Sequence, residues 1–309
     1  MKKTIAIIAL LLTVSMSAFA QFNYNGIEYK ILSGADKTVE VGNNSSFNGS
    51  EVIIPEKVTY SGMEYTVTGI GESAFFNNTF VTSVSIPATI KTIGDVAFRN
   101  CENLTSCTFE EDSQLEQIGD YAFYNTVLTT IDIPASVTSI GTIAFIYNTA
   151  LRQVYMHRDN PSGYSPNAFI SCPNVVIYAP AASYEAYNTK FNEFNKVEVE
   201  LTEWKTYATS KIEEGLNALN TLSDEDRNDV NKSLATIREP LTFDAAYAAF
   251  ENAMPIINAQ INFENTLKTA LGSMATKQNG PAVEIVGADG TTIRLYNIGK
   301  VRYIKETNK

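Results

Sequence analysis

The chain has 309 residues, which is enough for about two domains, and its 44% apolar and 18% charged residues form a globular composition that excludes wholesale disorder. With 23 Lys and Arg against 34 Asp and Glu, the net charge of -11 excludes the basic surface that nucleic-acid binding requires. Three cysteines are too few for a disulfide scaffold, and the single histidine, His157, excludes a metal site built from several histidines.

Residues 1–20 have the three parts of a secretory signal peptide. Two lysines follow Met1, residues 5–14 form an apolar run, and the small residues that a signal peptidase reads end at Ala20. The run is too short for a transmembrane anchor, which needs about 20 residues. No cysteine lies near the cut, so we do not expect a lipoprotein. We expect a chain that is exported by a cleaved signal peptide and is secreted or held at the cell surface or in the periplasm.

The middle of the chain is a repeat. An Ala-Phe pair recurs five times between residues 74 and 169, at spacings of 23, 25, 22 and 24 residues. An Ile-Gly pair precedes the first four at a fixed offset. Self-similarity at a period of about 20 to 29 residues predicts a leucine-rich-repeat solenoid. The pairs are Ala74-Phe75, Ala97-Phe98, Ala122-Phe123, Ala144-Phe145 and Ala168-Phe169.

Each repeat can be assigned piece by piece. A β-rich stretch such as VTSVSI or LTTIDI alternates apolar and polar residues, which predicts one short strand per coil. We expect the stacked strands to form a parallel sheet and the Ile-Gly step to turn the chain, with glycine permitting close approach. The Ala-Phe pair then fills the core. One inward position is shared by Val84, Cys107, Ile131 and Val154.

A polar or thiol residue lies three positions after the phenylalanine of each Ala-Phe pair. In leucine-rich repeats such residues often form a buried ladder that binds backbone groups of the turns. Cys101 and Cys172 hold this position three coils apart, which is too far for a disulfide. We therefore expect them, together with Cys107, to be buried free thiols. The five residues are Asn78, Cys101, Thr126, Asn148 and Cys172.

The repeat pattern, I-P-x2-[VI]-x2-I-G-x2-A-F-x2-[NC]-x2-L-x2-V, resembles the BspA-like leucine-rich repeats of secreted Bacteroidetes proteins and other bacterial surface proteins. The resemblance covers about residues 22–197. It departs at an insertion, residues 110–114, and at Tyr164-Ser165 in place of Ile-Gly, where we expect altered loops. Members of that family include adhesins that bind host matrix proteins, so the resemblance implies a binding protein without naming its ligand.

The two ends of the solenoid need caps. Residues 22–50 hold β-like runs that we expect to cover the first coil. Residues 181–194 predict a short helix that packs Tyr184, Tyr187 and Phe191 under the last coil.

After about residue 199 the period becomes helical. We expect helices over 201–222, from a capping box at Ser223 to 237, and from Thr242 to about 275, the last bent or broken by Pro255. A hairpin with Asp289-Gly290 as its turn should follow. The expected fold is α+β: a signal peptide (1–20), a capped solenoid of about five coils (21–198), and a small helical bundle with a β-hairpin (199–309).

Nothing in the sequence forms a catalytic constellation, and we expect no enzyme activity, cofactor or metal. The acidic run of residues 110–112 lacks calcium-loop spacing and is interpreted as a solvated loop. We expect a monomeric binding protein whose partner is a protein, such as a host extracellular matrix protein. The alternatives are a surface glycan-binding or accessory protein, a hydrolase carried by the C-terminal region, and a structural spacer.

Alternation along the strands places small residues on the outer face of the early coils and larger ones on the later coils. Gln153, Tyr155 and Tyr178 point outward, with His157 just past its strand. Exposed tyrosine is common in binding hot spots, so these four residues are the candidate ligand-binding residues. The alternative is that Tyr155 and Tyr178 form a cross-strand pair that only stabilises the sheet.

Overall fold

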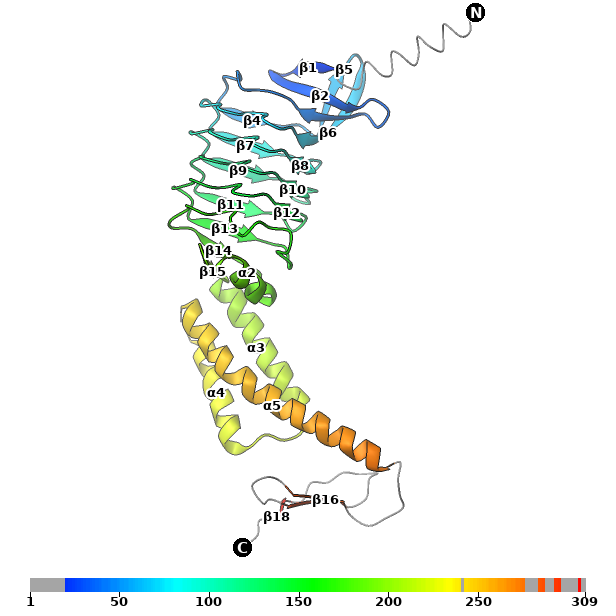
Figure 1. Cartoon of the computed structure of the whole chain (residues 1–309), viewed down its shortest axis with the longest axis vertical. Coiled ribbons are helices and arrows are strands. Elements are labelled where there is room, and N and C mark those ends of the chain that lie inside the picture. Colours follow the sequence, from blue (N-terminus) through cyan, green and yellow to red (C-terminus); the bar gives the residue numbers. More distant parts are fainter. Residues whose placement is uncertain (1–19, 240–241, 276–282, 287–291, 296–304, 307–309) are drawn as a thin grey trace, which may run out of the picture. The chain divides into compact units, whose positions relative to one another are not determined.

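The computed structural model describes residues 20–239, 242–275, 283–286, 292–295 and 305–306 (Figure 1). The predicted signal peptide therefore lies, apart from Ala20, outside the described residues. The chain divides into two compact units, Met1–Trp204 and Lys205–Lys309, which are described separately below.

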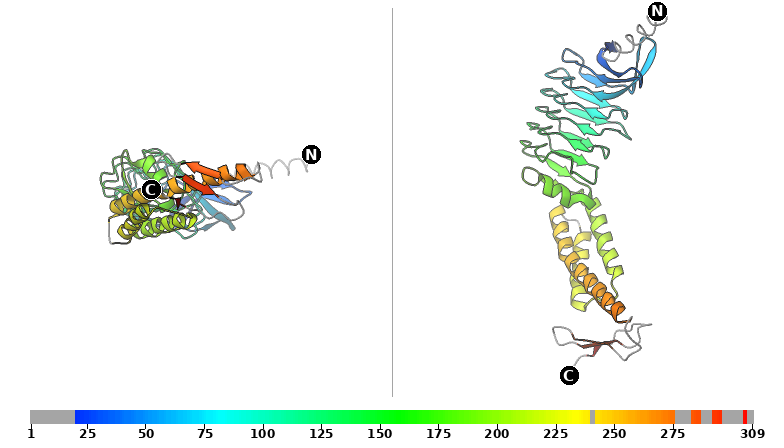
Figure 2. Two further views of the ribbon diagram at one scale, coloured as in Figure 1. Left: turned by 90° about the horizontal axis from the view of Figure 1, so that it is seen from below. Right: turned by 45° about the vertical axis from the view of Figure 1, so that its right-hand side comes forward.

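The first unit is a solenoid whose coils each place one strand in a common row (Figures 1 and 2). Every pair of hydrogen-bonded neighbours in this row is parallel. Val84 pairs with Cys107, and Ile131 with Val154, and all four side chains are buried, which confirms the predicted inward position. The strands are β4 (Glu51–Ile53), β7 (Ser83–Ile86), β9 (Ser106–Phe109), β11 (Thr130–Ile133), β13 (Gln153–Met156), β14 (Val176–Tyr178) and β15 (Lys196–Glu198).

The row is interrupted once, which the sequence analysis did not predict. Among residues 20–239, which are described without a gap, β4-β7-β9 form one sheet and β11-β13-β14-β15 another, and no ladder joins β9 to β11. The insertion, residues 110–114, follows β9 at this break. It is bound to the preceding coil, because Glu110 N donates to Ile86 O (3.0 Å) and Gln114 N donates to Ala88 O (2.9 Å).

The Ile-Gly steps form a second row of short strands rather than simple turns: β6 (Met63–Ile70), β8 (Thr92–Ile93), β10 (Gln117–Ile118) and β12 (Ser139–Ile140). The glycine that follows each isoleucine is required by close stacking. A Cβ on Gly119 would lie 2.7 Å from Asp95 N in the preceding coil. Where Tyr164-Ser165 replaces Ile-Gly, the row shrinks to a single bridge between Ile140 and Tyr164.

The N-terminal cap is a set of strands that extends this second row, with β3 parallel to β6 and the other pairs antiparallel, which confirms the expected β-type cap. Its order is β1-β2-β3-β6, and β5 pairs with β6. Phe22 and Tyr65 are buried in this cap, so its own side chains close the end of the core. The added strands are β1 (Gln21–Tyr24), β2 (Ile27–Ser33), β3 (Thr38–Val41) and β5 (Lys57–Tyr60).

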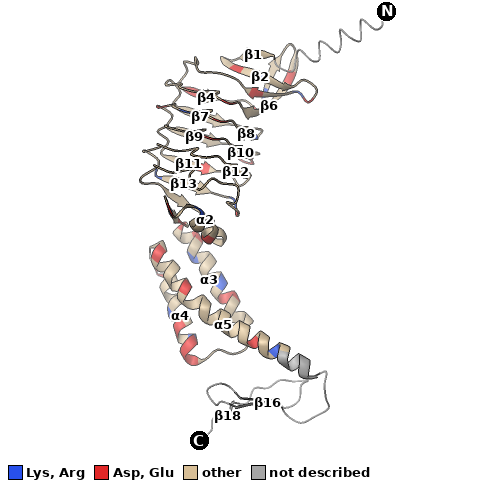
Figure 3. Cartoon of the chain, viewed as in Figure 1, with Lys and Arg blue, Asp and Glu red and all other residues tan. Residues whose placement is uncertain are grey.

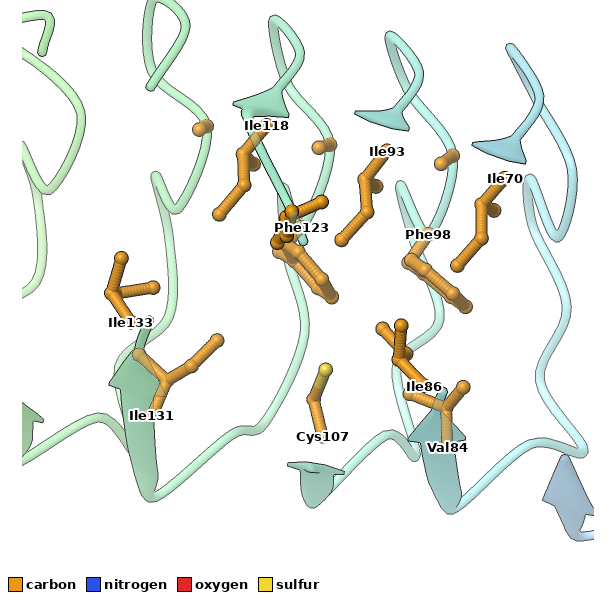
Figure 4. Packing of buried hydrophobic residues seen from close by; sticks show 14 of the residues in the cluster. Ile70, Val84, Ile86, Ile93, Phe98, Cys107, Ile118, Phe123, Ile131 and Ile133 are labelled. Atoms are coloured by element: carbon orange, nitrogen blue, oxygen red, sulfur yellow. The ribbon is translucent and has the colours of Figure 1, made fainter. Parts of the chain in front are cut away.

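The Ala-Phe pairs form the centre of the core, as predicted. Their five phenyl rings are fully buried and stack with centroid distances of 5.3, 5.1, 5.1 and 4.9 Å and interplanar angles of 5° to 14°. Figure 4 shows Phe98 and Phe123 in this stack, beside the isoleucines of the Ile-Gly steps. Phe47 and Phe191 close the two ends of the stack in T-shaped contacts.

The predicted polar ladder is present and is longer than expected. Cys101 Sγ donates to Phe75 O (3.1 Å), and Asn148 Nδ2 donates to Phe123 O (2.7 Å). Two buried residues that the pattern missed, Asn44 and Asn195, extend the ladder at its two ends. The three cysteines are free and buried, as expected.

The solenoid has about six turns, one more than the five Ala-Phe pairs suggested. The sixth turn ends in β15 and has no such pair, because the helix α2 (Tyr184–Phe191) replaces it after a 3-10 turn, η1 (Ala181–Ser183). Tyr187 and Phe191 of α2 are fully buried and Tyr184 is partly buried against the core, which confirms the predicted cap.

Three helices follow the solenoid: α3 (Leu201–Ala218), α4 (Asp224–Arg238) and α5 (Phe243–Ala275). The first four residues of α3 belong to the first unit. Ser223 caps α4 by accepting from Asp226 N, as predicted, and the acidic first turn of α4 is visible in Figure 3. Helix α3 ends four residues before the expected Leu222. Helix α5 continues through Pro255, so the predicted break is absent.

The predicted hairpin is present as two antiparallel strands, β16 (Val283–Val286) and β17 (Thr292–Leu295). A third strand, β18 (Lys305–Glu306), pairs with β17. The proposed turn, Asp289-Gly290, lies outside the described residues.

Candidate ligand-binding face

The candidate residues lie on the outward face of the second sheet. In the register of β11, β13, β14 and β15, one outward row contains two tyrosines between two carboxylates. Glu198 also forms an ion pair with Lys196 on its own strand. The row is Asp132, Tyr155, Tyr178 and Glu198.

Tyr155 and Tyr178 form the cross-strand pair that the sequence predicted. Their ring centroids are 5.0 Å apart with an interplanar angle of 15°, so the rings stack with an offset. Both residues are partly exposed. The pKa of Tyr155 is raised, first by desolvation and then by its electrostatic interactions with Glu200, Tyr178 and Asp132.

His157 lies immediately beyond β13, at the edge of a groove. Its Nε2 is 2.5 Å from Asp132 Oδ1, and its backbone N donates to Ile133 O (3.3 Å). The groove has a volume of about 830 Å³ and occupies the interruption between β9 and β11. The inserted carboxylates Glu110, Glu111 and Asp112 line one side of it.

A second hollow, of about 210 Å³, adjoins the tyrosine pair. Tyr155, His157 and Tyr178 line it together with Glu200 and Glu203. Thus three of the four candidate residues meet at one place. Gln153 lies partly buried at the start of β13 and lines neither hollow.

Cys107, His157 and Asp132 all line the groove. These are the residue types of a thiol nucleophile, a base and an orienting carboxylate, in that order. The geometry does not assemble such a device. The Cys107 side chain points into the core between Val84 and Ile131 (Figure 4), and burial raises its pKa. Ser136 Oγ, also in the groove, has no hydrogen-bond partner, so it is not bonded to His157.

Among the residues that the structure describes, no group of three or more His, Cys, Asp and Glu could hold a metal ion. No helix in the described part of the chain has the length and apolar character that crossing a bilayer requires.

Sequence reasoning missed the acidic surroundings of the tyrosines. Strand alternation places Asp132 outward and could have identified it as a neighbour of Tyr155. Glu200 and Glu203 had no such signal, since they follow the last strand and reach the hollow only through the path of the chain into α3.

Comparisons with known proteins agree with this fold. A family model for the BspA type leucine rich repeat region matches residues 68–198 in six copies. A leucine-rich repeat protein from Bacteroides capillosus is 32% identical, with a TM-score of 0.40, over 44% of this chain and 98% of that one. No curated protein matches the chain.

Two longer solved structures are also similar. A leucine-rich repeat protein from Bacteroides ovatus is 28% identical over 52% of this chain and 47% of its own, with a TM-score of 0.38. The pneumococcal vaccine antigen PcpA is 27% identical over 52% of this chain and 41% of its own, with a TM-score of 0.38. The chain therefore spans less than half the length of these two proteins.

The six matched repeats coincide with the six turns of the solenoid, and sequence identity extends over nearly the whole of the Bacteroides capillosus protein. The chain belongs to the BspA-type leucine-rich-repeat family.

Proposed function

We propose that the chain is an exported, non-catalytic binding protein that holds a protein ligand on the outward face of β13 and β14. The observation that carries this proposal is the partly exposed Tyr155–Tyr178 stack, beside a hollow and a groove that both reach His157. Tyrosine provides a large contact area with few rotatable bonds, and it is enriched at the centres of protein interfaces. The small outward side chains of the earlier coils, such as Ser85 and Thr108, offer much less contact area.

The geometry of the stack favours a protein over a neutral glycan at this place. A sugar platform needs an open ring face. Here each ring covers part of one face of the other, and the register puts Asp132 next to Tyr155 and Glu198 next to Tyr178 on the opposite sides. The ring edges and hydroxyl groups remain available, and these suit the polar and apolar groups of a protein surface.

The charges around the stack define the partner further. Carboxylates lie on both sides of the tyrosines, in the row itself and in the two hollows. A partner that presents Lys or Arg would therefore be attracted and oriented. An acidic partner would be repelled by the carboxylates of this face.

The test is a binding screen of residues 21–309 against purified extracellular matrix proteins and neutral glycans. We expect saturable binding to a basic matrix protein, which weakens as salt is added. The Tyr155→Ala, Tyr178→Ala double variant should bind at least about tenfold more weakly.

The matched control is the Ser85→Ala, Thr108→Ala double variant, at the same strand position in earlier coils, which should bind as the wild type does. Circular dichroism melting of both variants checks the fold. Unchanged affinity of the tyrosine variant while it stays folded would refute this site. Binding only to neutral glycans would refute the proposed ligand class.

A further inference from the structure

Arg99 lies among aromatic rings, away from the strand face. It follows Phe98 directly, and the residues at the same repeat position in the neighbouring coils are Phe76 and Tyr124. Its Cζ is 4.7 Å from the centroid of the Tyr124 ring and 6.0 Å from that of Phe76. Tyr121 contributes a third ring at 5.5 Å. The guanidinium is thus oriented by three rings.

Within the described residues, the Arg99 side chain has no hydrogen-bond or ion-pair partner, and its Nε is buried and unsatisfied. The other two arginines of the solenoid differ, since Arg152 and Arg158 donate to backbone carbonyls. A buried polar atom without a partner requires an explanation. The lack of an acidic partner for Arg99 is more notable because the chain has 34 Asp and Glu residues.

Three acidic residues in these turns are already hydrogen-bonded elsewhere. Asp95 Oδ1 accepts from Asp120 N (2.8 Å), and Asp120 Oδ1 accepts from Thr142 N (2.6 Å). Glu102 Oε1 accepts from Asn125 Nδ2 (3.2 Å). The fold therefore supplies rings to Arg99 but no anion.

The aromatic surface continues beyond the arginine. The Tyr121 and Tyr124 centroids are 6.0 Å apart, and Tyr147 meets Tyr124 edge to face at 5.4 Å. Tyr147 is 50% exposed. The Tyr124 and Tyr147 rings are nearly perpendicular, so they do not stack in parallel as Tyr155 and Tyr178 do.

A ladder of asparagines follows the same line from coil to coil. Asn77, Asn100 and Asn125 each come directly after Phe76, Arg99 and Tyr124. Asn100 Nδ2 donates to Asn77 Oδ1 (2.8 Å), and Asn125 Nδ2 donates to Asn100 Oδ1 (3.2 Å). All three have left-handed backbone, with φ of 58°, 60° and 53°, which asparagine tolerates well.

We propose that Arg99 and its aromatic neighbours bind the carboxylate of an acidic sugar, such as a uronic acid unit of a polysaccharide. Guanidinium pairs with carboxylate through two parallel hydrogen bonds, and that geometry needs a fork held in place, as the rings hold it here. Exposed tyrosine suits the C–H faces of a sugar, and asparagine amides suit its hydroxyl groups. This site is separate from the strand face, and it stands whether or not that face binds a protein.

The experiment titrates the full mature chain with tetragalacturonic acid and with its methyl ester, using isothermal calorimetry. The ester has the same shape without the charge. We expect saturable binding of the acid, at least about tenfold weaker binding of the ester, and an affinity for the acid that falls with added salt.

Variants locate the site. Arg99→Gln should lose binding by at least about tenfold, whereas Arg152→Gln, which removes an arginine without ring contacts, should not change it. Tyr147→Ala should weaken binding by several-fold while leaving Arg99 and its three rings in place. This last variant keeps the test decisive if Arg99→Gln unfolds.

Three results would overturn the proposal: no binding of the acid, equal binding of acid and ester, or unchanged affinity in both folded variants. A short glutamate peptide serves as a further arm. If it binds as tightly as the uronate and depends on Arg99 equally, the site recognises protein carboxylates and the sugar assignment is wrong.

Discussion

The phenyl rings of the Ala-Phe pairs are the residues on which the solenoid depends most. Phe98 lies between Phe75 and Phe123, with centroid distances of 5.3 and 5.1 Å, and no part of its side chain is exposed. A ring in the middle of a stack has neighbours on both faces, so its loss leaves a cavity that neither neighbouring coil can fill.

We expect Phe98→Ala to lower the free energy of unfolding by about 3 to 5 kcal/mol, from lost transfer energy and the cavity. Phe80→Ala is the control, because Phe80 is 59% exposed in the same unit, and it should change stability by less than about 0.5 kcal/mol. Urea unfolding measures both variants. Equal losses would mean that the stack does not carry the core.

The buried thiols make the protein sensitive to alkali. Burial raises the pKa of Cys101 to about 12 and that of Cys172 to about 11, while backbone hydrogen bonding opposes the shift weakly. In the unfolded chain these thiols ionise from about pH 8.5, so the folded state then binds more protons. Stability is complete below that pH and is lost as pH rises through the folded values.

We expect the free energy of unfolding to fall between about pH 8.5 and 11, by at most about 1.4 kcal/mol per pH unit for each thiol. The Cys101→Asn, Cys172→Asn double variant should lose less over this range, because Asn78 and Asn148 show that asparagine suits the same repeat position. Urea unfolding at pH 8 and pH 10.5 compares the two proteins. Identical alkaline losses would assign the sensitivity to other groups.

At the scale of elements, Glu264 of α5 organises the end of α3. Its carboxylate accepts from Asn220 N (3.1 Å) and Thr221 N (3.0 Å), and also from Asn220 Nδ2 (2.6 Å). Desolvation raises the pKa of Glu264, but the hydrogen bonds from Asn220 and Thr221 outweigh it, and the pKa is lowered overall. The segment between α3 and α4 is thus tied to α5 by an ionised carboxylate.

We expect Glu264→Gln to speed amide hydrogen exchange at Asn220 and Thr221, since a neutral amide oxygen accepts more weakly. In the wild type, this protection should be present above about pH 4.3 and be lost as pH falls through the lowered pKa. Glu251→Gln, on the exposed face of the same helix, is the control. Unchanged exchange at the two amides would show that the carboxylate does not hold this segment.

At the scale of the whole molecule, the predicted signal peptide and the N-terminal cap meet at one residue. The cut after Ala20 leaves Gln21, the first residue of β1, at the new N-terminus. All four residues of β1 pair with β2, from Gln21 with Lys30 to Tyr24 with Ile27. Cleavage at this position therefore keeps the whole of β1 and removes one contact of the cap, the hydrogen bond from Ile31 N to Ala20 O (3.0 Å).

We expect the native host to release a mature chain that begins at Gln21, with a net charge of -13 because two lysines are lost from the value of -11. N-terminal sequencing or intact mass of the extracytoplasmic protein measures this. A chain that keeps Met1 and stays in the cytoplasm would contradict both the signal peptide and the proposed function.

The sequence by itself determined the coil. Each repeat contacts only its two neighbours, so a residue's position in the period decides which side chains it meets, and this placed the phenyl stack, the inward strand position and the Tyr155–Tyr178 pair. Only the tertiary structure decided what happens where the period fails or ends. The insertion binds the preceding coil at the place where the sheet is interrupted, α2 takes the place of a missing Ala-Phe turn, and α5 runs through Pro255. Surface contacts such as those of Arg99 also depended on the tertiary structure. The repeat period fixes the position of a residue's Cα in the coil, but the rotamers of a long side chain decide which partner its end contacts.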